Sequence, residues 1–271
     1  MSDRSSGKLS NSERSSLATA LRNAASSGIP MEPLSASHPD MNVVDAYAIQ
    51  SINIDQRRQE GATCVGHKIG ITSKAVQEWL KVNEPDFGCL MDDMIYADGA
   101  DIPASRLMQP RMEGEIAFVL GRDLKGPGLT ALDVIRATDH LLPCIEIIDS
   151  RIRDWKFTYE DTVADNASSG LVLMGTRPAR LQDVDLSLCG MALRKNGTVV
   201  STGAGAACLG NPVQAVLWLA QKVNDMEPDG PGIPAGSLVL SGALGPVCPI
   251  EAGDAIEVEI SGVGNVRANI G

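Results

Sequence analysis

Three glutamates are the residues in this sequence most able to do chemistry together. Glu113 and Glu115 lie two residues apart in MEGEIAFVL, so their side chains leave the same face if this segment is a strand. Glu146 interrupts the apolar run LLPCIEII, where an unpaired carboxylate is costly or must be neutralised. Three carboxylates without a neighbouring cysteine or histidine form an all-oxygen site, which suits Mg²⁺ or Mn²⁺ and suits zinc poorly. The glutamates therefore predict a divalent-metal site with open positions for a substrate.

Each part of this prediction has a plainer alternative. The pair in MEGE also fits the solvated end of an ordinary strand. Glu146 could instead be neutralised by a structural salt bridge to Arg111, Arg151 or Arg153.

A lysine and an aspartate are candidates for moving protons. Lys68 lies in the apolar segment GHKIGIT, and a lysine desolvated near a bound cation has its pKa lowered towards the range where it exchanges protons. The alternative is a buried stem whose ammonium reaches water. Asp86, between proline and phenylalanine in NEPDFG, has the least solvated surroundings of the aspartates in its loop.

A serine-rich segment, DNASSG, offers the hydroxyl of Ser168. No GxSxG elbow surrounds it, and only three histidines could act as its base, which disfavours a Ser-His-Asp triad. We expect hydrogen bonding from this segment instead. The glycine-rich segments GRDLKGPG and STGAGAACLG lack the context of a phosphate-binding loop, so nucleotide binding has no support.

The elements that must position these side chains are a helical start and a strand-rich centre. Helical periodicity predicts helices over 17–25 and 43–58, and capping patterns predict further helices from Thr130 and Pro212. Short apolar runs bounded by glycine, proline and aspartate predict strands, and alternation near the C-terminus predicts a hairpin. The pattern is α+β. We expect a disordered lead-in over 1–16, a helical arm over 17–61 and a catalytic domain over 62–271.

Composition limits the class of protein. The chain has 271 residues, 44% of them hydrophobic, and a net charge of −11, which repels a polyanion. Aromatic residues make up only 3%, too few for the stacking platforms that hold single strands, so no nucleic acid is expected as a partner. No apolar run approaches the roughly 18 residues that span a bilayer, so no membrane is expected either.

The N-terminus and the cysteines indicate the compartment. MSDRSSGKLSNSERSS is polar and has no apolar core, so it does not resemble a secretory signal. The six cysteines are scattered without a CxxC pair, which argues against a zinc ribbon or a disulfide framework. We predict six reduced thiols and a cytoplasmic location.

Five segments in order resemble one family. GHKIGITS, EPDFGCLMDDM, QPRMEGEIAFVLGRDL, CIEIIDSRIRDW and DTVADNASSG are similar, at this spacing, to the fumarylacetoacetate hydrolase superfamily, in its branch of 2-keto-4-pentenoate hydratases. The resemblance covers about residues 40–271. It implies a fumarylacetoacetate hydrolase-like fold with a central mixed β-roll and flanking helices.

The same resemblance implies roles for particular residues. It gives Glu113, Glu115 and Glu146 as ligands of Mg²⁺ or Mn²⁺, and Lys68, Asp86 and Ser168 as catalytic residues. Ser241, in SGALG, is a weaker candidate for a contact with the substrate carboxylate. Members of the family form homo-oligomers, often through dimers into rings, and association with an aldolase or decarboxylase of the pathway is a further expectation.

The implied reaction is the hydration of a 2-hydroxydienoate or its 2-oxo tautomer to a 4-hydroxy-2-oxo acid, in the catabolism of aromatic compounds. A 2-oxo-3-hexenedioate (4-oxalocrotonate) decarboxylase would share the metal site and the enolate. An acylpyruvate C–C hydrolase is a second alternative, although it usually needs a His-Glu pair that is not evident here. A non-catalytic binding protein for small acids is the alternative from another class.

Overall fold

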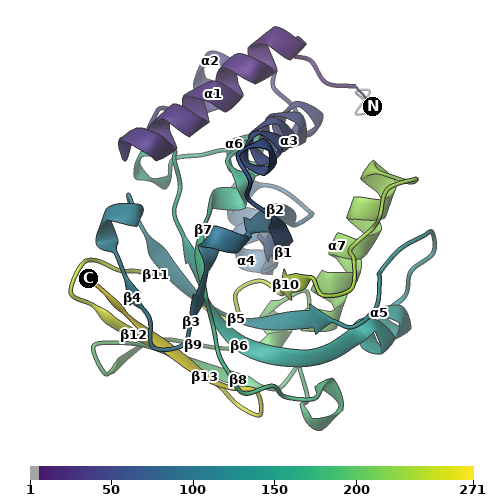
Figure 1. The fold of residues 1–271 in the computed structure, drawn as a ribbon, viewed down its shortest axis with the longest axis vertical. Coiled ribbons are helices and arrows are strands. Elements are labelled where there is room, and N and C mark those ends of the chain that lie inside the picture. The colour runs from purple at the N-terminus through teal and green to yellow at the C-terminus, as the bar shows by residue number, and fades with distance from the viewer. Residues whose placement is uncertain (1–5) are drawn as a thin grey trace.

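The computed structural model describes residues 6–271 (Figure 1). Its helices are α1 (Asn11–Ser27), α2 (Leu34–Ser37), α3 (Val43–Gln59), α4 (Lys74–Leu80), α5 (Ala131–Ala137), α6 (Tyr159–Ala164) and α7 (Pro212–Met226). Its strands are β1 (Cys64–Gly70), β2 (Asp86–Met91), β3 (Ile95–Ala97), β4 (Asp101–Ile102), β5 (Arg111–Leu120), β6 (Thr138–Ile148), β7 (Ser169–Met174), β8 (Gly190–Lys195), β9 (Thr198–Ala204), β10 (Leu238–Leu240), β11 (Cys248–Pro249), β12 (Ala255–Ile260) and β13 (Gly264–Ile270).

The first helix begins earlier than the start at residue 17 that the sequence predicts. Ser10 Oγ accepts a hydrogen bond from the Glu13 N–H, and the Glu13 carboxylate accepts one from the Ser10 N–H. This capping box satisfies the free donors of the first turn, so α1 begins at Asn11. The expected disordered lead-in is therefore wrong from Asn11 onwards, and its residues 1–5 lie outside the described part of the chain.

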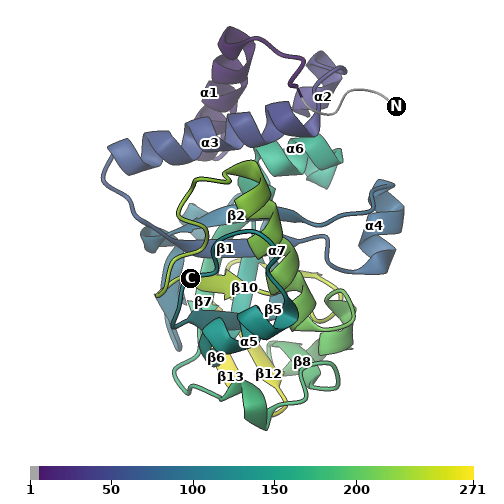
Figure 2. The same cartoon turned by 90° about the vertical axis from the view of Figure 1, so that its right-hand side faces the viewer.

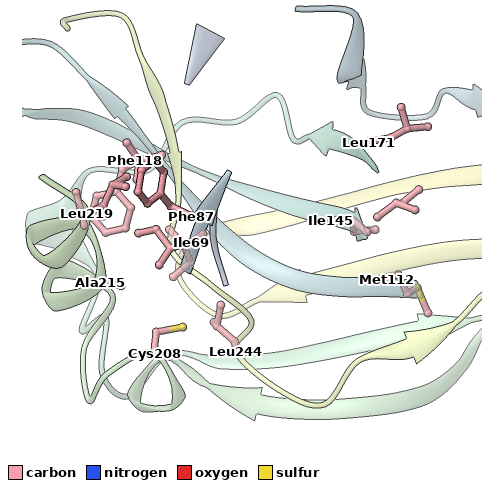
Figure 3. Packing of buried hydrophobic residues seen from close by; sticks show 14 of the residues in the cluster. Ile69, Phe87, Met112, Phe118, Ile145, Leu171, Cys208, Ala215, Leu219 and Leu244 are labelled. Carbon is pink, nitrogen blue, oxygen red and sulfur yellow. The ribbon is translucent and has the colours of Figure 1, made fainter. Parts of the chain in front are cut away.

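Two sheets pack face to face. The larger has the strand order β2-β1-β10-β5-β6-β7-β3, with β11 also paired to β5, and the smaller has the order β4-β13-β12-β8-β9. Buried side chains from both sheets form one core, part of which Figure 3 shows around Met112, Ile145 and Leu244. Gly114 lies where the sheets approach closely, because a side chain there would collide with Val258. The predicted α+β class and β-roll fold are confirmed.

The larger sheet curls, so that its other face becomes an interior. Leu90 on β2 and Val172 on β7 come from strands far apart in the sheet order, yet both belong to one small buried cluster with Ala117, Cys144 and Leu240. These residues share the face of the sheet that carries Glu115 and Glu146. The predicted site therefore lies inside the roll.

A helical layer covers β1 and β2. Figures 1 and 2 show α1 and α3 at one end of the molecule, with α6 beneath α3. Tyr47 of α3 stacks on Phe87 of β2 with ring centroids 4.8 Å apart, and both belong to the main core. The predicted helical arm thus packs directly on the strand that begins with Asp86. Among the helices of residues 6–271, none combines the length and apolar character needed to cross a membrane.

The prediction of six reduced thiols is wrong for one pair. Cys64 and Cys89 form a disulfide between β1 and β2. The pairing of these strands shifts between Cys64 and Gly66, and this irregularity places Cys64 opposite Met91, on the same side as Cys89. A bulge of this kind leaves no mark in the spacing of the cysteines. Cys144, Cys189, Cys208 and Cys248 are free.

Candidate active site

The three predicted metal ligands lie on paired strands. Glu113 and Glu115 are on β5, and Glu146 of β6 is the register partner of Glu113. One carboxylate oxygen from each lies within 4.8 Å of the others. Glu115 and Glu146 are buried and Glu113 is partly exposed, so the cluster opens towards solvent on the side of Glu113.

The structure offers a direct test of the salt-bridge alternative. Lys68 Nζ lies 3.3 Å from Glu146 Oε1, and Glu146 has no arginine partner among the ion pairs of residues 6–271. Arg151 pairs with Asp165, and Arg153 pairs with Glu32. The arginine alternatives are therefore wrong, and the single lysine leaves the cluster with excess negative charge.

The donor set fits a hard divalent cation. Glu115 Oε1 and both carboxylate oxygens of Glu146 are buried, and none accepts a hydrogen bond from the described residues, although the Lys68 ammonium forms an ion pair with Glu146 Oε1. Buried oxygens of this kind are costly unless something compensates them. The three glutamates would hold Mg²⁺ or Mn²⁺, both of which prefer oxygen ligands.

The proton affinity of the cluster reflects the same crowding. Burial and the like charge of Glu146 raise the pKa of Glu113 to about 7. Burial and the neighbouring carboxylates also raise the pKa of Glu115, and burial raises that of Glu146 against the opposing effect of Lys68. A cation at this position would favour the ionised form of all three.

This arrangement predicts how stability depends on pH when the metal has been removed by a chelator. Burial and the like charge of Glu146 raise the pKa of folded Glu113 to about 7, whereas in the unfolded chain the carboxyl loses its proton near its ordinary pKa of 4.5. The folded state therefore binds more protons in this window, and the contribution of Glu113 to stability falls as the pH rises through it. We expect the Tm of the wild type minus that of Glu113→Gln, measured with chelator, to decrease as the pH rises from about 4.5 to 7. A difference that stays constant would contradict this assignment, and saturating Mg²⁺ should reverse the trend.

Lys68 and Asp86 lie beside the glutamates on adjacent strands. Lys68 Nζ donates a 3.0 Å hydrogen bond to the Ala167 carbonyl. A side chain on Gly70 would contact both Lys68 Nζ and Asp86 Oδ1, so these two groups lie on the same side of that glycine. Asp86 Oδ1 is buried and accepts no hydrogen bond from residues 6–271. The lysine and the aspartate thus lie together beside the glutamate cluster.

The pKa of Lys68 is shifted upwards, whereas the sequence analysis expects it to be lowered. Burial alone would lower it, but the carboxylates of Glu146 and Asp86 raise it above its usual value. Burial raises the pKa of Asp86, and the charge of Lys68 opposes that change. The surroundings therefore favour an ammonium at Lys68 and a proton-accepting carboxyl at Asp86. A divalent cation on the glutamates would offset part of their effect on the lysine.

Ser168 lies behind Asp86 in a chain of hydroxyls. Its Oγ is 3.3 Å from Thr162 Oγ1, which donates a 3.4 Å hydrogen bond to Asp86 Oδ2. Ser168 Oγ also donates to Asp165 Oδ2 at 3.5 Å. The structure thus connects Ser168 to Asp86 through Thr162, a residue that the sequence analysis did not single out.

Ser241 is close to the cluster, but its hydroxyl bonds to the backbone. Ser241 Oγ accepts from the Ile116 N–H at 3.4 Å and lies 3.3 Å from the Gly242 carbonyl, to which it donates. The next residue makes the contact with the site, because the Gly242 N–H donates to Glu115 Oε2 at 2.8 Å. Sequence reasoning missed this group and the Ala167 carbonyl, since a backbone atom has no residue type to identify it.

Known proteins are similar in sequence to this chain over most of its length. A 2-keto-4-pentenoate hydratase of Paraburkholderia xenovorans is 51% identical over 255 residues, which cover 94% of each chain. A 2-hydroxyhexa-2,4-dienoate hydratase of Comamonas testosteroni is 46% identical over 86% of this chain and 88% of its own. Among solved structures, the 4-oxalocrotonate decarboxylase from Pseudomonas putida G7, complexed with magnesium and adipate, superposes with a TM-score of 0.92 at 37% identity, covering 98% of this chain and 100% of its own.

The same relationship appears in the part of the chain that carries the site. Residues 58–271 match the family description "Fumarylacetoacetate (FAA) hydrolase C-terminal", and this range includes every candidate site residue. With the relatives above, this match confirms the resemblance inferred from the motifs. The chain belongs to the fumarylacetoacetate hydrolase family.

Proposed function

We propose that this protein is a divalent-metal-dependent hydratase. It adds water to 2-hydroxypenta-2,4-dienoate (2-oxopent-4-enoate) or a close homologue and gives a 4-hydroxy-2-oxo acid, in the catabolism of aromatic compounds. The observation that carries the proposal is the placement of the Lys68 ammonium 3.3 Å from Glu146, within a three-glutamate cluster suited to a hard cation. The hydratases that are 46–51% identical over most of the chain support it.

The chemistry can be divided between the cation and the side chains. A bound Mg²⁺ or Mn²⁺ would act as a Lewis acid for a substrate's carboxylate and C2 oxygen and would stabilise enolate charge. Protonation at C5 with loss of the proton from the 2-hydroxyl gives the α,β-unsaturated ketone. Water then adds its oxygen at C4, and C3 gains a proton. Lys68 delivers and recovers protons, Asp86 assists it, and Ser168 orients the substrate or the water.

The first test is the identity of the product. We expect freshly generated 2-hydroxypenta-2,4-dienoate to lose its ultraviolet absorption when enzyme and Mg²⁺ or Mn²⁺ are present, and the product mass to show the gain of one water. No turnover of this substrate or of its longer homologues would overturn the proposal.

Decarboxylation is the second candidate, favoured by the structural similarity to the 4-oxalocrotonate decarboxylase. The hydratases have the higher sequence identity, 51% against 37%. Release of carbon dioxide from 2-oxo-3-hexenedioate, without hydration of the dienoate, would reverse the order of the two candidates. Binding of both compounds without turnover would instead indicate a binding protein.

The hydrolase alternative gains nothing from the histidines near the site. His67 is on β1, but its neighbour Lys68 faces the cluster, so His67 points to the other side of the strand. Its burial lowers the pKa of His67 to about 4, which makes it a poor base. His140 pairs with Asp139 at the opposite end of β6 from Glu146.

Four expectations from the sequence stay proposals: the physiological ion, the homo-oligomer built through dimers, the association with an aldolase or decarboxylase of the pathway, and the cytoplasmic location. Light scattering of the purified protein tests the assembly, and activity with each ion in turn tests the metal. Co-purification with an aldolase or decarboxylase of the same pathway tests the remaining partner.

A further inference from the structure

A short turn closes the roll beside the site. Residues Asn166–Ser168 connect α6 to β7 and lie against β2. Asn166 Oδ1 accepts from the Cys89 N–H at 2.8 Å, and Asn166 Nδ2 donates to the Cys89 carbonyl at 2.9 Å. The carboxamide therefore makes the pair of bonds that a neighbouring strand would make with β2. Gly88 permits this approach, because a side chain there would collide with the Asn166 carbonyl.

The backbone of this turn is strained. Asn166, Ala167 and Ser168 have φ values of 56°, 52° and 52°, three consecutive non-glycine residues in the left-handed region. Such residues persist only where the surroundings hold them, and they concentrate at functional sites.

A buried network holds one side of the turn. Arg151 pairs with the Asp165 carboxylate and donates to the Asp165 carbonyl. The same guanidinium donates to the carbonyls of Asp149 at 2.6 Å and Ser169 at 2.7 Å. Arg151 thus fixes the residues on both sides of the turn, and Asn166 fixes the turn itself to β2.

The turn contributes two groups to the site. The Ala167 carbonyl accepts the hydrogen bond of Lys68 Nζ, and the Ser168 hydroxyl continues the chain towards Asp86. Lys68 is therefore held between a carbonyl of this turn and the Glu146 carboxylate. Movement of the turn would release the ammonium from one of its two partners.

We propose that Asn166 is a positioning residue for Lys68. Its carboxamide joins the strained turn to β2 and so fixes the Ala167 carbonyl that directs the ammonium. This inference rests on the role of Lys68 in the proposed function. The positioning role of Asn166 requires both hydrogen bonds of its carboxamide, because a single bond would allow the turn to rotate about that bond.

The test uses Asn166→Asp, which keeps an acceptor for the Cys89 N–H and tolerates a positive φ but places a carboxylate oxygen against the Cys89 carbonyl. We expect kcat for hydration to fall about 10- to 100-fold, as misplacement of a catalytic group by about 1 Å can cause. The affinity for Mg²⁺ should stay close to that of the wild type, because the glutamates are not bonded to Asn166.

A second asparagine provides a matched control. Asn196 also has a positive φ, of 53°, and its carboxamide donates to Asp254 Oδ1 at 2.7 Å and accepts from the Ala255 N–H at 2.8 Å. It lies in the turn between β8 and β9, in the other sheet. Asn196→Asp should lower Tm but leave kcat unchanged. An equal loss of kcat in both variants, or full kcat in Asn166→Asp, would overturn the inference.

A readout without substrate separates this inference from the proposed function. The labelling rate of the Lys68 amine by an acylating reagent, followed by peptide mass spectrometry, should rise in Asn166→Asp and stay at the wild-type value in Asn196→Asp. Faster labelling combined with a wild type that hydrates no dienoate would refute the function alone, whereas unchanged labelling would refute the positioning role. If Asn166→Asp does not fold, Asn166→Gly serves the same purpose, because glycine adopts the required φ without strain and lacks both hydrogen bonds.

Discussion

Replacing Lys68 with methionine is expected to lower kcat for hydration about 1,000-fold, within the range that general acid–base groups contribute. Methionine keeps an unbranched apolar stem but cannot carry a proton. In the wild type, the Lys68 ammonium is buried, lies 3.3 Å from Glu146 and donates to the Ala167 carbonyl. No other lysine forms an ion pair with a glutamate of the cluster in residues 6–271, so no neighbouring ammonium can substitute for it.

Metal affinity distinguishes loss of the proton carrier from collapse of the site. Removing the ammonium leaves the carboxylates without their buried positive partner, so Lys68→Met should bind Mg²⁺ at least as tightly as the wild type does. Calorimetric titration of the chelator-treated protein measures this affinity. An inactive variant with normal or stronger metal binding would support the proton-transfer role.

Another lysine provides the control for this substitution. Lys222 of α7 is partly buried and pairs with Glu84 at 3.2 Å, yet it does not touch the glutamate cluster. Lys222→Met makes the same change at another ion-paired lysine, and this variant should retain hydratase turnover. Full hydratase activity in Lys68→Met would exclude Lys68 as the proton carrier, whatever the result with Lys222.

The side chains of the site were predictable from the sequence, because residue type and the alternation of side chains along a strand identify them. The spacing of Glu113 and Glu115 predicts one face of a strand, and the apolar surroundings of Glu146 predict a need for compensation. These two patterns, with the family motifs, identify the residues that the fold brings together inside the roll. The fold class was also predictable from the sequence, because the apolar runs that form strands and the residues that cap helices are local features.

The remaining part depends on contacts between distant segments. The Gly242 N–H reaches Glu115, and the Ala167 carbonyl reaches Lys68, only because β10 and the turn before β7 lie beside β5 and β1. The disulfide of Cys64 likewise depends on an irregular strand pairing. By contrast, the start of α1 was encoded locally by Ser10 and Glu13, a capping pattern that compositional reasoning about a polar lead-in overlooked.

Replacing Glu115 with glutamine is expected to weaken Mg²⁺ binding about 100-fold or more, since even partners outside the coordination sphere can cost 10- to 100-fold. Glu115 is the best of the three glutamates for this test. Its Oε2 accepts from the Gly242 N–H, which a glutamine oxygen can also do, and its Oε1 has no donor among the described residues. The substitution therefore removes a charge and a ligand with little change in shape. Glu146→Gln would also disturb Lys68, because those side chains form an ion pair.

Activity and stability should then move in opposite directions. Hydration by Glu115→Gln should be almost lost at low Mg²⁺ and should recover in part at high Mg²⁺, whereas the wild type should lose activity only in chelator and regain it with Mg²⁺ or Mn²⁺. Without metal, and at pH values above the ordinary glutamate pKa of 4.5, the variant should have the higher Tm, because the wild-type cluster buries three neighbouring carboxyls whose pKa values burial raises. Glu32→Gln, on an exposed ion pair with Arg153, should change neither quantity. Wild-type metal affinity in Glu115→Gln, or activity that survives the chelator, would show that the cluster is not the metal site.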